Sequence, residues 1–128
     1  MLSALMPRLP RARPRHLLGI GDEASVRVAV ALGCDTMDSS WPTRAGRHGT
    51  LFTSRGVIAI KKGVYERMHV TPDPECDCSV CATHTLAYLH HLYKAREPVL
   101  CSLAALHNLA YTHRLMRNLR ADILHGWL

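Results

Sequence analysis

Hydrophobic positions in the first third of the chain follow the pattern of a strand, a helix and a second strand. Residues 16–18 form a short apolar run, and a turn leads from them to Asp22, whose side chain can cap a helix. The helix is expected to continue to about Leu32 and to end at Gly33, before a second apolar run at residues 34–38. Two strands joined by a helix within so short a stretch predict a parallel βαβ unit.

The middle of the chain alternates β-rich runs with turn residues. We expect a loop from Ser39 onward, followed by strands at residues 51–53 and 57–60. Gly56 lies between these strands, where a left-handed residue would allow a hairpin. Residues 64–65 are expected to be extended.

Helical periodicity returns in the last third of the chain. It predicts one helix from about Val80 to Lys94, interrupted before Pro98, and a second from about Leu100 to Leu124. In the second helix we expect one apolar stripe of Leu109, Met116, Leu119 and Ile123. Across the pair of helices we expect inward positions at Tyr88, Leu89, Leu92 and Leu106.

Composition limits the size and the partners of the protein. The 128 residues, 48% of them hydrophobic, suit one modest domain with one core. A formal net charge of +6 and a pI near 9.4 favour a polyanionic partner such as nucleic acid. Residues 1–15 carry prolines and arginines without periodicity, which predicts a mostly irregular segment without a secretory signal. No run approaches the roughly 18 apolar residues of a membrane span, so we expect a cytoplasmic protein.

Three of the five cysteines are clustered in the pattern Cys76-x-Cys78-x2-Cys81. Three thiolates and one further ligand make a closed tetrahedral zinc site of the structural kind. Spacing does not decide the fourth ligand, because His107 and Cys101 both lie at a plausible distance along the chain. Other histidines are also available, at His84, His90, His91 and His113. Three unrelated free thiols are the alternative to a metal site.

Asp35 and Asp38 lie at the end of the second predicted strand. The carboxyl ends of parallel strands carry the catalytic groups of barrel enzymes, and a carboxylate there can attack the anomeric carbon of a sugar. One of this pair is therefore a candidate nucleophile. The alternative is a helix cap or a salt-bridge partner.

A basic segment follows the acidic strand end. Arg44 and Arg47 lie three residues apart in an expected glycine-containing loop, which could contact an RNA backbone or a base edge. A solvated basic loop is the alternative.

Gly19-x-Gly21 is similar to a dinucleotide-binding fingerprint. We discount it as a nucleotide site, because Asp22 and Glu23 place negative charge where a pyrophosphate would lie.

Four motifs together resemble the tRNA-guanine transglycosylase family, in the same order along the chain and over residues 5–120. They are LLGIG at 17–21, Gly33-x-Asp35-x2-Asp38, PTRAGRHG at 42–49, and the cysteine motif followed by YLHHL and HNLAY. The resemblance implies an α/β fold that is the carboxy-terminal portion of a (β/α)8 TIM barrel with a zinc-binding α+β subdomain. It also implies exchange of guanine 34 of a tRNA anticodon for a 7-deazaguanine, preQ1 or queuine, in queuosine modification.

The resemblance also implies roles for individual residues. Asp38 matches the family's nucleophile, which forms a covalent link to ribose, and Asp35 matches an acid before it. Leu18 and Gly19 match residues that line the base pocket, and the arginines of PTRAGRHG, Arg44 and Arg47, match residues that approach the anticodon loop. One structural Zn2+ would be held by Cys76, Cys78, Cys81 and His107. The chain departs from the usual family pattern at His16, Leu18, Ser39 and Ser40.

Length sets a further expectation, because a (β/α)8 barrel needs about 250 residues. We expect residues 1–50 to be the last strand–helix–strand unit of a partial barrel, 51–75 a hairpin insertion and linker, and 76–128 the zinc-binding helical subdomain. The resemblance places a second catalytic aspartate in earlier strands, so this chain alone is expected to be inactive, with a homodimer or a missing amino-terminal half completing it. The alternatives are an inactive zinc-binding module for RNA binding or dimerisation, and a decayed reading frame.

Overall fold

The computed structural model describes residues 1–128 and contains six α-helices and two small sheets. The chain divides into two compact units. One unit comprises residues 1–41 and 114–128, and the other comprises residues 42–113. The longest helix, α6 (Val99–Leu124), contributes residues to both units. None of the helices combines the length and the apolar character needed to cross a membrane.

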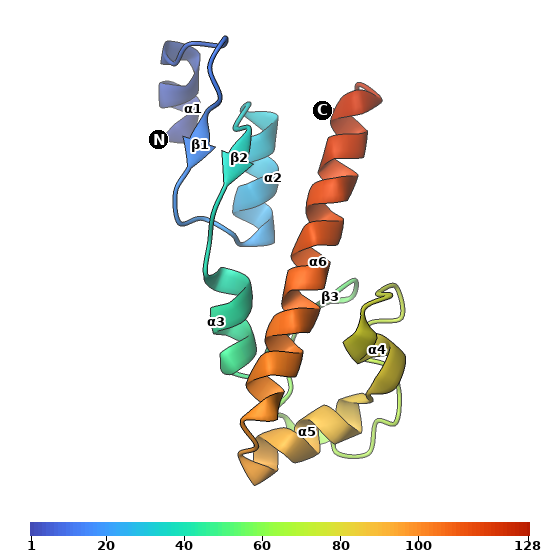
Figure 1. Ribbon diagram of the computed structural model, residues 1–128. Coiled ribbons are helices and arrows are strands. Elements are labelled where there is room, and N and C mark those ends of the chain that lie inside the picture. Colours follow the sequence, from blue (N-terminus) through green and yellow to red (C-terminus); the bar gives the residue numbers. More distant parts are fainter. The chain divides into compact units, whose positions relative to one another are not determined.

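The first unit is built on the predicted βαβ arrangement. Strands β1 (His16–Leu17) and β2 (Thr36–Met37) pair in parallel, and α2 (Glu23–Ala31) connects them (Figure 1). The Asp22 side chain caps α2 by accepting a hydrogen bond from the backbone N–H of Ser25 at 3.0 Å. Gly33, with φ +88°, ends the helix, because this left-handed conformation is open to glycine at little cost. The sequence prediction of a parallel unit is therefore confirmed.

Two small clusters of buried side chains hold the first unit together. Met6, Ala29 and Cys34 form one cluster, against which Leu17 and Met37 pack. The other cluster consists of Val26, Leu115 and Leu119, with Val30, Met37 and Met116 packed against it.

The prediction of an irregular amino terminus was partly wrong, since α1 (Leu2–Leu5) and the 3-10 helix η1 (Met6–Arg8) precede β1. Burial of Met6 explains why this short turn forms.

The second unit contains the predicted hairpin. Strands β3 (Thr50–Thr53) and β4 (Gly56–Ala59) pair antiparallel, and Gly56 has φ +105° at their turn. Leu51 and Ile60 are completely buried against leucines of the helices. The extended segment expected at residues 64–65 is instead the 3-10 helix η2 (Gly63–Tyr65), closed by a bond from the Tyr65 N–H to the Lys62 carbonyl.

One predicted helix is two helices. The helix expected from Val80 to Lys94 is divided into α4 (Ser79–Thr83) and α5 (Leu86–Ala95). The Thr85 side chain caps α5, and the backbone N–H groups of Leu86 and Ala87 donate to carbonyls of residues 70 and 68. Because these amides already have partners outside the helix, α5 starts afresh instead of continuing α4.

The expected loop after Ser39 is also helical, forming α3 (Trp41–Arg47). The Ser39 hydroxyl accepts from the Trp41 N–H at 3.1 Å, and Pro42 lies in the first turn, where a helix does not need an N–H.

The apolar stripe predicted for α6 was partly wrong, because Leu109 and Ile123 are exposed while His107 and Asn108 are completely buried. Two of the four expected inward positions of the helix pair are also exposed, namely Tyr88 and Leu106.

Candidate metal centre and acidic strand end

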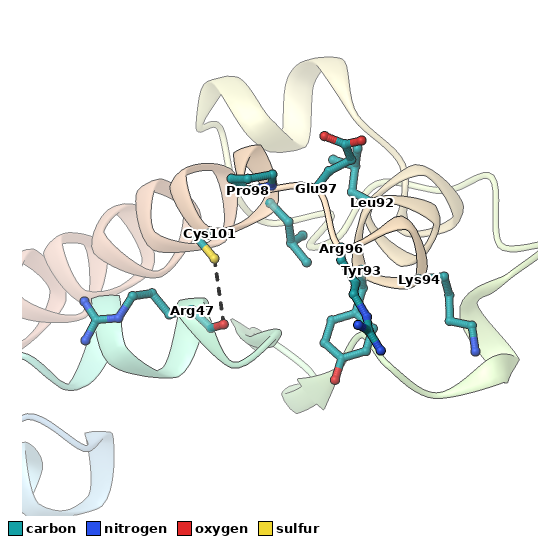
Figure 2. Close-up of a pocket in the computed structure, with 9 residues that line it drawn as sticks. Arg47, Leu92, Tyr93, Lys94, Arg96, Glu97, Pro98 and Cys101 are labelled. Carbon is teal, nitrogen blue, oxygen red and sulfur yellow. Dashed lines mark hydrogen bonds between the residues drawn. The ribbon is translucent and has the colours of Figure 1, made fainter.

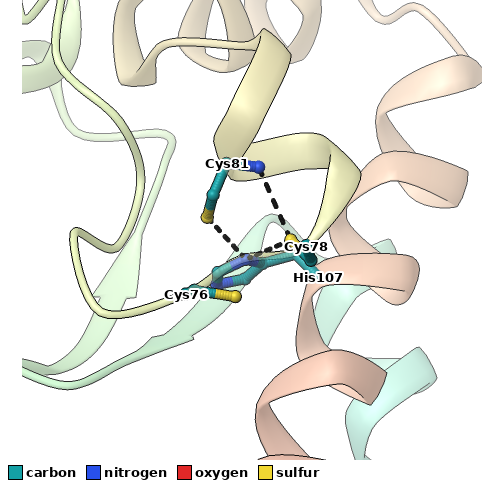
Figure 3. Close-up of side chains that lie close together, drawn as sticks. All are labelled: Cys76, Cys78, Cys81 and His107. Carbon is teal, nitrogen blue, oxygen red and sulfur yellow. Dashed lines mark hydrogen bonds between the residues drawn. The ribbon is translucent and has the colours of Figure 1, made fainter.

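Three cysteines and one histidine come together in the second unit. The ligand atoms of Cys76, Cys78, Cys81 and His107 all lie within 4.8 Å of one another (Figure 3). The segment before α4 supplies Cys76 and Cys78, the latter at the N-cap position, while Cys81 lies within α4 and His107 on α6. Cysteine spacing therefore places three sulfur atoms around one helix start, and the fourth donor comes from a distant part of the chain.

The imidazole of His107 is oriented by the strand beside it. Its Nε2 lies 2.8 Å from the carbonyl oxygen of Phe52, and a carbonyl can only accept, so Nε2 carries the proton. The lone pair of Nδ1 then faces the thiols, 3.6 Å from the Cys78 sulfur and 3.3 Å from the Cys81 sulfur. A metal-binding histidine needs this arrangement, with one nitrogen held by a backbone acceptor and the other open to the ion.

Burial makes two of the three thiols poor acids on their own. It raises the pKa of Cys76 and raises the pKa of Cys81 to about 12, since a thiolate loses its hydration there. Three thiolates in such a place repel one another and need a cation. The donor set of three sulfurs and one nitrogen fits a soft or borderline divalent metal in tetrahedral coordination. The cluster could therefore hold a metal ion.

Asp73 supports the loop that carries the cysteines, although sequence reasoning assigned it no role. Its completely buried carboxylate accepts from the Ser54 hydroxyl at 2.6 Å, the Ser54 N–H at 3.2 Å and the Glu75 N–H at 3.1 Å. Its carbonyl accepts from the Cys76 N–H at 3.1 Å. An aspartate between two prolines was the available signal, because aspartates in turns often bond nearby amides.

The acidic strand end lies in the first unit. Asp38 follows β2 directly, and its Oδ1 lies 3.0 Å from Nε2 of His16 and 3.3 Å from the backbone N–H of Gly19. The other ring nitrogen of His16 lies 2.8 Å from the Thr36 hydroxyl. Asp35 points elsewhere and accepts from the Arg15 N–H at 2.7 Å. His16 in β1 and Gly19 in the turn after β1 thus hold the carboxylate of Asp38, which follows the neighbouring strand β2.

Hydrogen bonding keeps Asp38 ionised. The bond from His16, followed by the bond from the Gly19 N–H, holds the pKa of Asp38 below its ordinary value of 3.8. The side chain is 60% exposed, so the carboxylate remains open to solvent. The bonds from His16 and Gly19 both end on Oδ1. A charged oxygen that faces solvent from a strand end is able to act as a nucleophile.

Comparison with known proteins decides the family. A family model described as queuine tRNA-ribosyltransferase matches residues 1–128. The chain belongs to the queuine tRNA-ribosyltransferase family. It is 50% identical over 97 residues to a queuine tRNA-ribosyltransferase of Protochlamydia amoebophila, covering 76% of this chain and 25% of that protein. It is 42% identical over 127 residues to the protein of the same name from Granulibacter bethesdensis, covering 99% of this chain and 34% of that protein.

These relatives are considerably longer than the chain. A queuine tRNA-ribosyltransferase of Chlamydia caviae is 45% identical over 118 residues, which are 91% of this chain and 32% of that protein. The chain therefore spans about a third of the length of such relatives. The resemblance to tRNA-guanine transglycosylases seen in the sequence is confirmed as a family relationship.

The other candidate residues of this queuine tRNA-ribosyltransferase family member lie outside the metal cluster. Leu18, 76% exposed, and Gly19, with φ +72°, follow β1, and the Gly19 N–H donates to the Asp38 carboxylate at 3.3 Å. Arg44 and Arg47 are exposed on α3, in the other unit. Cys101, the rival fourth ligand, instead donates towards the Arg47 carbonyl at 3.8 Å. The other histidines considered as ligands, His84, His90, His91 and His113, are outside the ligand cluster.

Proposed function

We propose that this chain is part of a tRNA-guanine transglycosylase that exchanges guanine 34 of a tRNA anticodon for a 7-deazaguanine. Family membership supports the reaction class, and the geometry of Asp38 supports the chemistry. The observation that carries the proposal is an ionised, solvent-facing carboxylate held at the end of a parallel strand. Because the chain covers about a third of its relatives, the proposal concerns the whole enzyme to which these residues correspond.

Asp38 would act as the nucleophile through Oδ2. His16 and Gly19 hold Oδ1, so Oδ2 is the oxygen that can approach C1′ of the ribose. Attack forms an ester bond between aspartate and C1′ while the bond from C1′ to guanine N9 breaks, and its electron pair leaves with guanine. The incoming base then attacks C1′ and releases the carboxylate. Protonation of guanine needs a second acid, which the family resemblance places in earlier barrel strands.

The substrate contacts follow the same resemblance. Leu18 and Gly19 are proposed to line the pocket for the base, whether preQ1 or queuine. Arg44 and Arg47 are proposed to contact the anticodon loop, and both side chains are exposed on α3. This makes tRNA the macromolecular partner and the cytoplasm the proposed location.

We propose that the metal is a single structural Zn2+. Three thiolates and one imidazole fill a tetrahedral shell and leave no position open to substrate, so the ion would stabilise the second unit without entering the reaction. It would connect the segment around α4 with α6 and so replace part of the apolar core that a small unit lacks.

The wider architecture is also a proposal. The parallel β1–α2–β2 unit is the repeating element of a (β/α)8 barrel, which supports assigning residues 1–50 to the last part of one. Residues 51–75 would be the hairpin insertion and linker, and 76–128 the zinc-binding subdomain. A homodimer is also proposed. It is supported by the aromatic side chain of Tyr88 on α5, which is 43% exposed and packs on His84, because exposed aromatic side chains are enriched at protein interfaces.

A chimera tests the catalytic proposal. The 127 aligned residues of this chain would replace the corresponding 34% of the Granulibacter bethesdensis relative, which restores a chain of full family length. We expect the chimera to form a covalent band with substrate tRNA on a denaturing gel and the Asp38→Asn chimera to form none. A covalent band that persists in Asp38→Asn contradicts the role of Asp38.

A second candidate function is a zinc-stabilised module that binds RNA without catalysis. The favouring observation is that the four metal ligands and the two exposed arginines all belong to one compact unit, residues 42–113. Salt-sensitive RNA binding by the 128-residue chain, together with a chimera that never forms an adduct, supports this candidate over the first.

A further inference from the structure

Helix α3 lies antiparallel against α6 within the second unit. The Arg47 carbonyl accepts from the thiol of Cys101 at 3.8 Å, a contact that Figure 2 shows beside a hollow at the turn between α5 and α6. At the opposite end of α3, the Pro42 carbonyl accepts from the Asn108 side chain at 3.0 Å. Positions 101 and 108 are seven residues apart, two turns along the same face of α6.

Close packing lies between these two contacts. A Cβ added to Gly46 would come within 2.7 Å of the Ala105 nitrogen and 2.9 Å of the Ala104 carbonyl carbon. Glycine is therefore required at this position of α3 because the two helix backbones approach too closely for a side chain. The orientation of α3 consequently depends on α6.

Asn108 uses its whole amide group in this arrangement. The side chain is completely buried, its Nδ2 donates to the carbonyls of Pro42 at 3.0 Å and Thr50 at 2.9 Å, and its Oδ1 accepts from the Phe52 N–H at 2.9 Å. It thereby joins α6 to the start of α3 and to strand β3. No carboxylate or apolar side chain could make all three bonds, because they require two donors and one acceptor.

Phe52 links Asn108 to the metal cluster. Its N–H donates to Asn108, and its carbonyl accepts from Nε2 of His107, the neighbouring residue on α6 and one of the four clustered ligands. A single strand residue is thus bonded to a metal-ligand candidate on one side and to the residue that holds α3 on the other.

We infer that Asn108 is a positioning residue that couples the metal centre to α3, so that ligand His107, strand β3 and the arginines of α3 keep one fixed arrangement. The consequence for RNA rests on the proposed function, in which Arg44 and Arg47 contact the anticodon loop. Metal binding then fixes the surface that meets RNA, although the ion touches neither arginine.

The test compares Asn108→Ala with Asn118→Ala in the zinc-loaded 128-residue chain. Asn118 is an exposed asparagine on the same helix, so its substitution controls for helix propensity. Amide hydrogen exchange followed by NMR should become about 10-fold to 100-fold faster at residues 45–49 in Asn108→Ala, the range expected when a buried hydrogen-bond network is left incomplete. Zinc affinity, measured by chelator competition, should fall by about 10-fold because the partner of His107 loosens. Exchange at residues 45–49 equal to that of the native chain overturns the inference.

If Asn108→Ala does not fold, Gly46→Ala tests the same coupling by a change in α3 instead of in α6. The added methyl group displaces α3, and the inference expects faster exchange at the Phe52 amide as well as at residues 45–49. Faster exchange at residues 45–49 with an unchanged Phe52 amide overturns the coupling.

Binding of a synthetic anticodon stem-loop RNA, followed by fluorescence anisotropy, separates this inference from the proposed function. Weaker binding by Asn108→Ala than by Asn118→Ala supports both. Faster exchange with unchanged RNA binding supports the coupling and refutes the role of α3 in binding RNA.

Discussion

The metal cluster and the acidic strand end differ in how far the protein surrounds them. His107 is completely buried and Cys81 is 8% exposed, whereas the Asp38 side chain is 60% exposed. The buried thiols have raised pKa values and need a cation to become charged, while Asp38 is charged already because its pKa is lowered. Buried sulfur and nitrogen donors are suited to holding an ion that stabilises a fold, and an exposed carboxylate is suited to attack on a substrate.

Loss of the metal should affect the second unit most. Cys78→Ser removes one of three thiolates, and structural zinc sites contribute on the order of 10 kcal/mol to folding. We expect metal analysis to fall from about one zinc per chain to almost none, and cooperative unfolding of residues 42–113 to be lost in circular dichroism. Cys101→Ser is the matched control and should keep both. Retention of full zinc content by Cys78→Ser contradicts the site.

Removal of the charge on Asp38 should affect reactivity far more than stability. In the chimera, Asp38→Asn should lower the rate of adduct formation by on the order of 10⁴, as removal of a member of a catalytic set does. The melting temperature should change only slightly, as it does for most substitutions at exposed positions. Asp122→Asn, on α6, serves as the charge control and should react normally. A large loss of stability in Asp38→Asn would indicate a structural role instead.

The cap of α2 should have a moderate effect on stability. Asp22→Ala removes the acceptor for the Ser25 N–H and should cost about 1 kcal/mol in the free energy of unfolding of the first unit. Asp22→Asn keeps a capping oxygen and should cost much less. Chemical denaturation with urea measures both variants, and equal losses for the two would show that charge, not capping, is what matters.

The smallest effect concerns the acidity of Asp38. His16→Ala removes the strongest cause of its lowered pKa, so the pKa should rise towards 3.8 but stay below it, because the Gly19 N–H remains. A group with a lowered pKa stabilises the fold above its ordinary pKa, and this contribution disappears as the pH falls through the folded-state value. His16→Ala should therefore narrow the stability difference between neutral pH and pH 3. Carbon-13 NMR titration of the carboxyl group measures the shift, and an unchanged pKa contradicts the role of His16.

Local signals in the sequence predicted much of the fold. Asp22, Gly33 and Gly56 mark chain positions where capping or positive φ is needed, and the elements beside them were predicted correctly. The break between α4 and α5 could not be predicted, because it depends on hydrogen bonds from α5 to residues 68 and 70. Helix α3 was missed for a similar reason, since Gly46 weakens a helix by itself and fits here only because α6 lies against it.

In the candidate site too, the sequence predicted what depends on neighbouring residues and missed what depends on residues far apart in the chain. Cysteine spacing indicated a metal site, but spacing alone could not choose between His107 and Cys101. The three-dimensional arrangement distinguishes them, because Phe52 orients the imidazole of His107 towards the sulfurs. Asn108 and His16 act through tertiary hydrogen bonds, so nothing in their immediate sequence reveals their roles. Only Asp73, between two prolines, had a local signal.

Mass spectrometry of the trapped adduct would identify the residue that attacks the ribose. The chimera would be incubated with substrate tRNA, denatured, and digested with nuclease and protease, and the ribose-modified peptide would be sequenced. We predict that the added mass lies on Asp38. A modification on any other residue, or a productive base exchange that leaves Asp38 unmodified at every time point, would contradict the account.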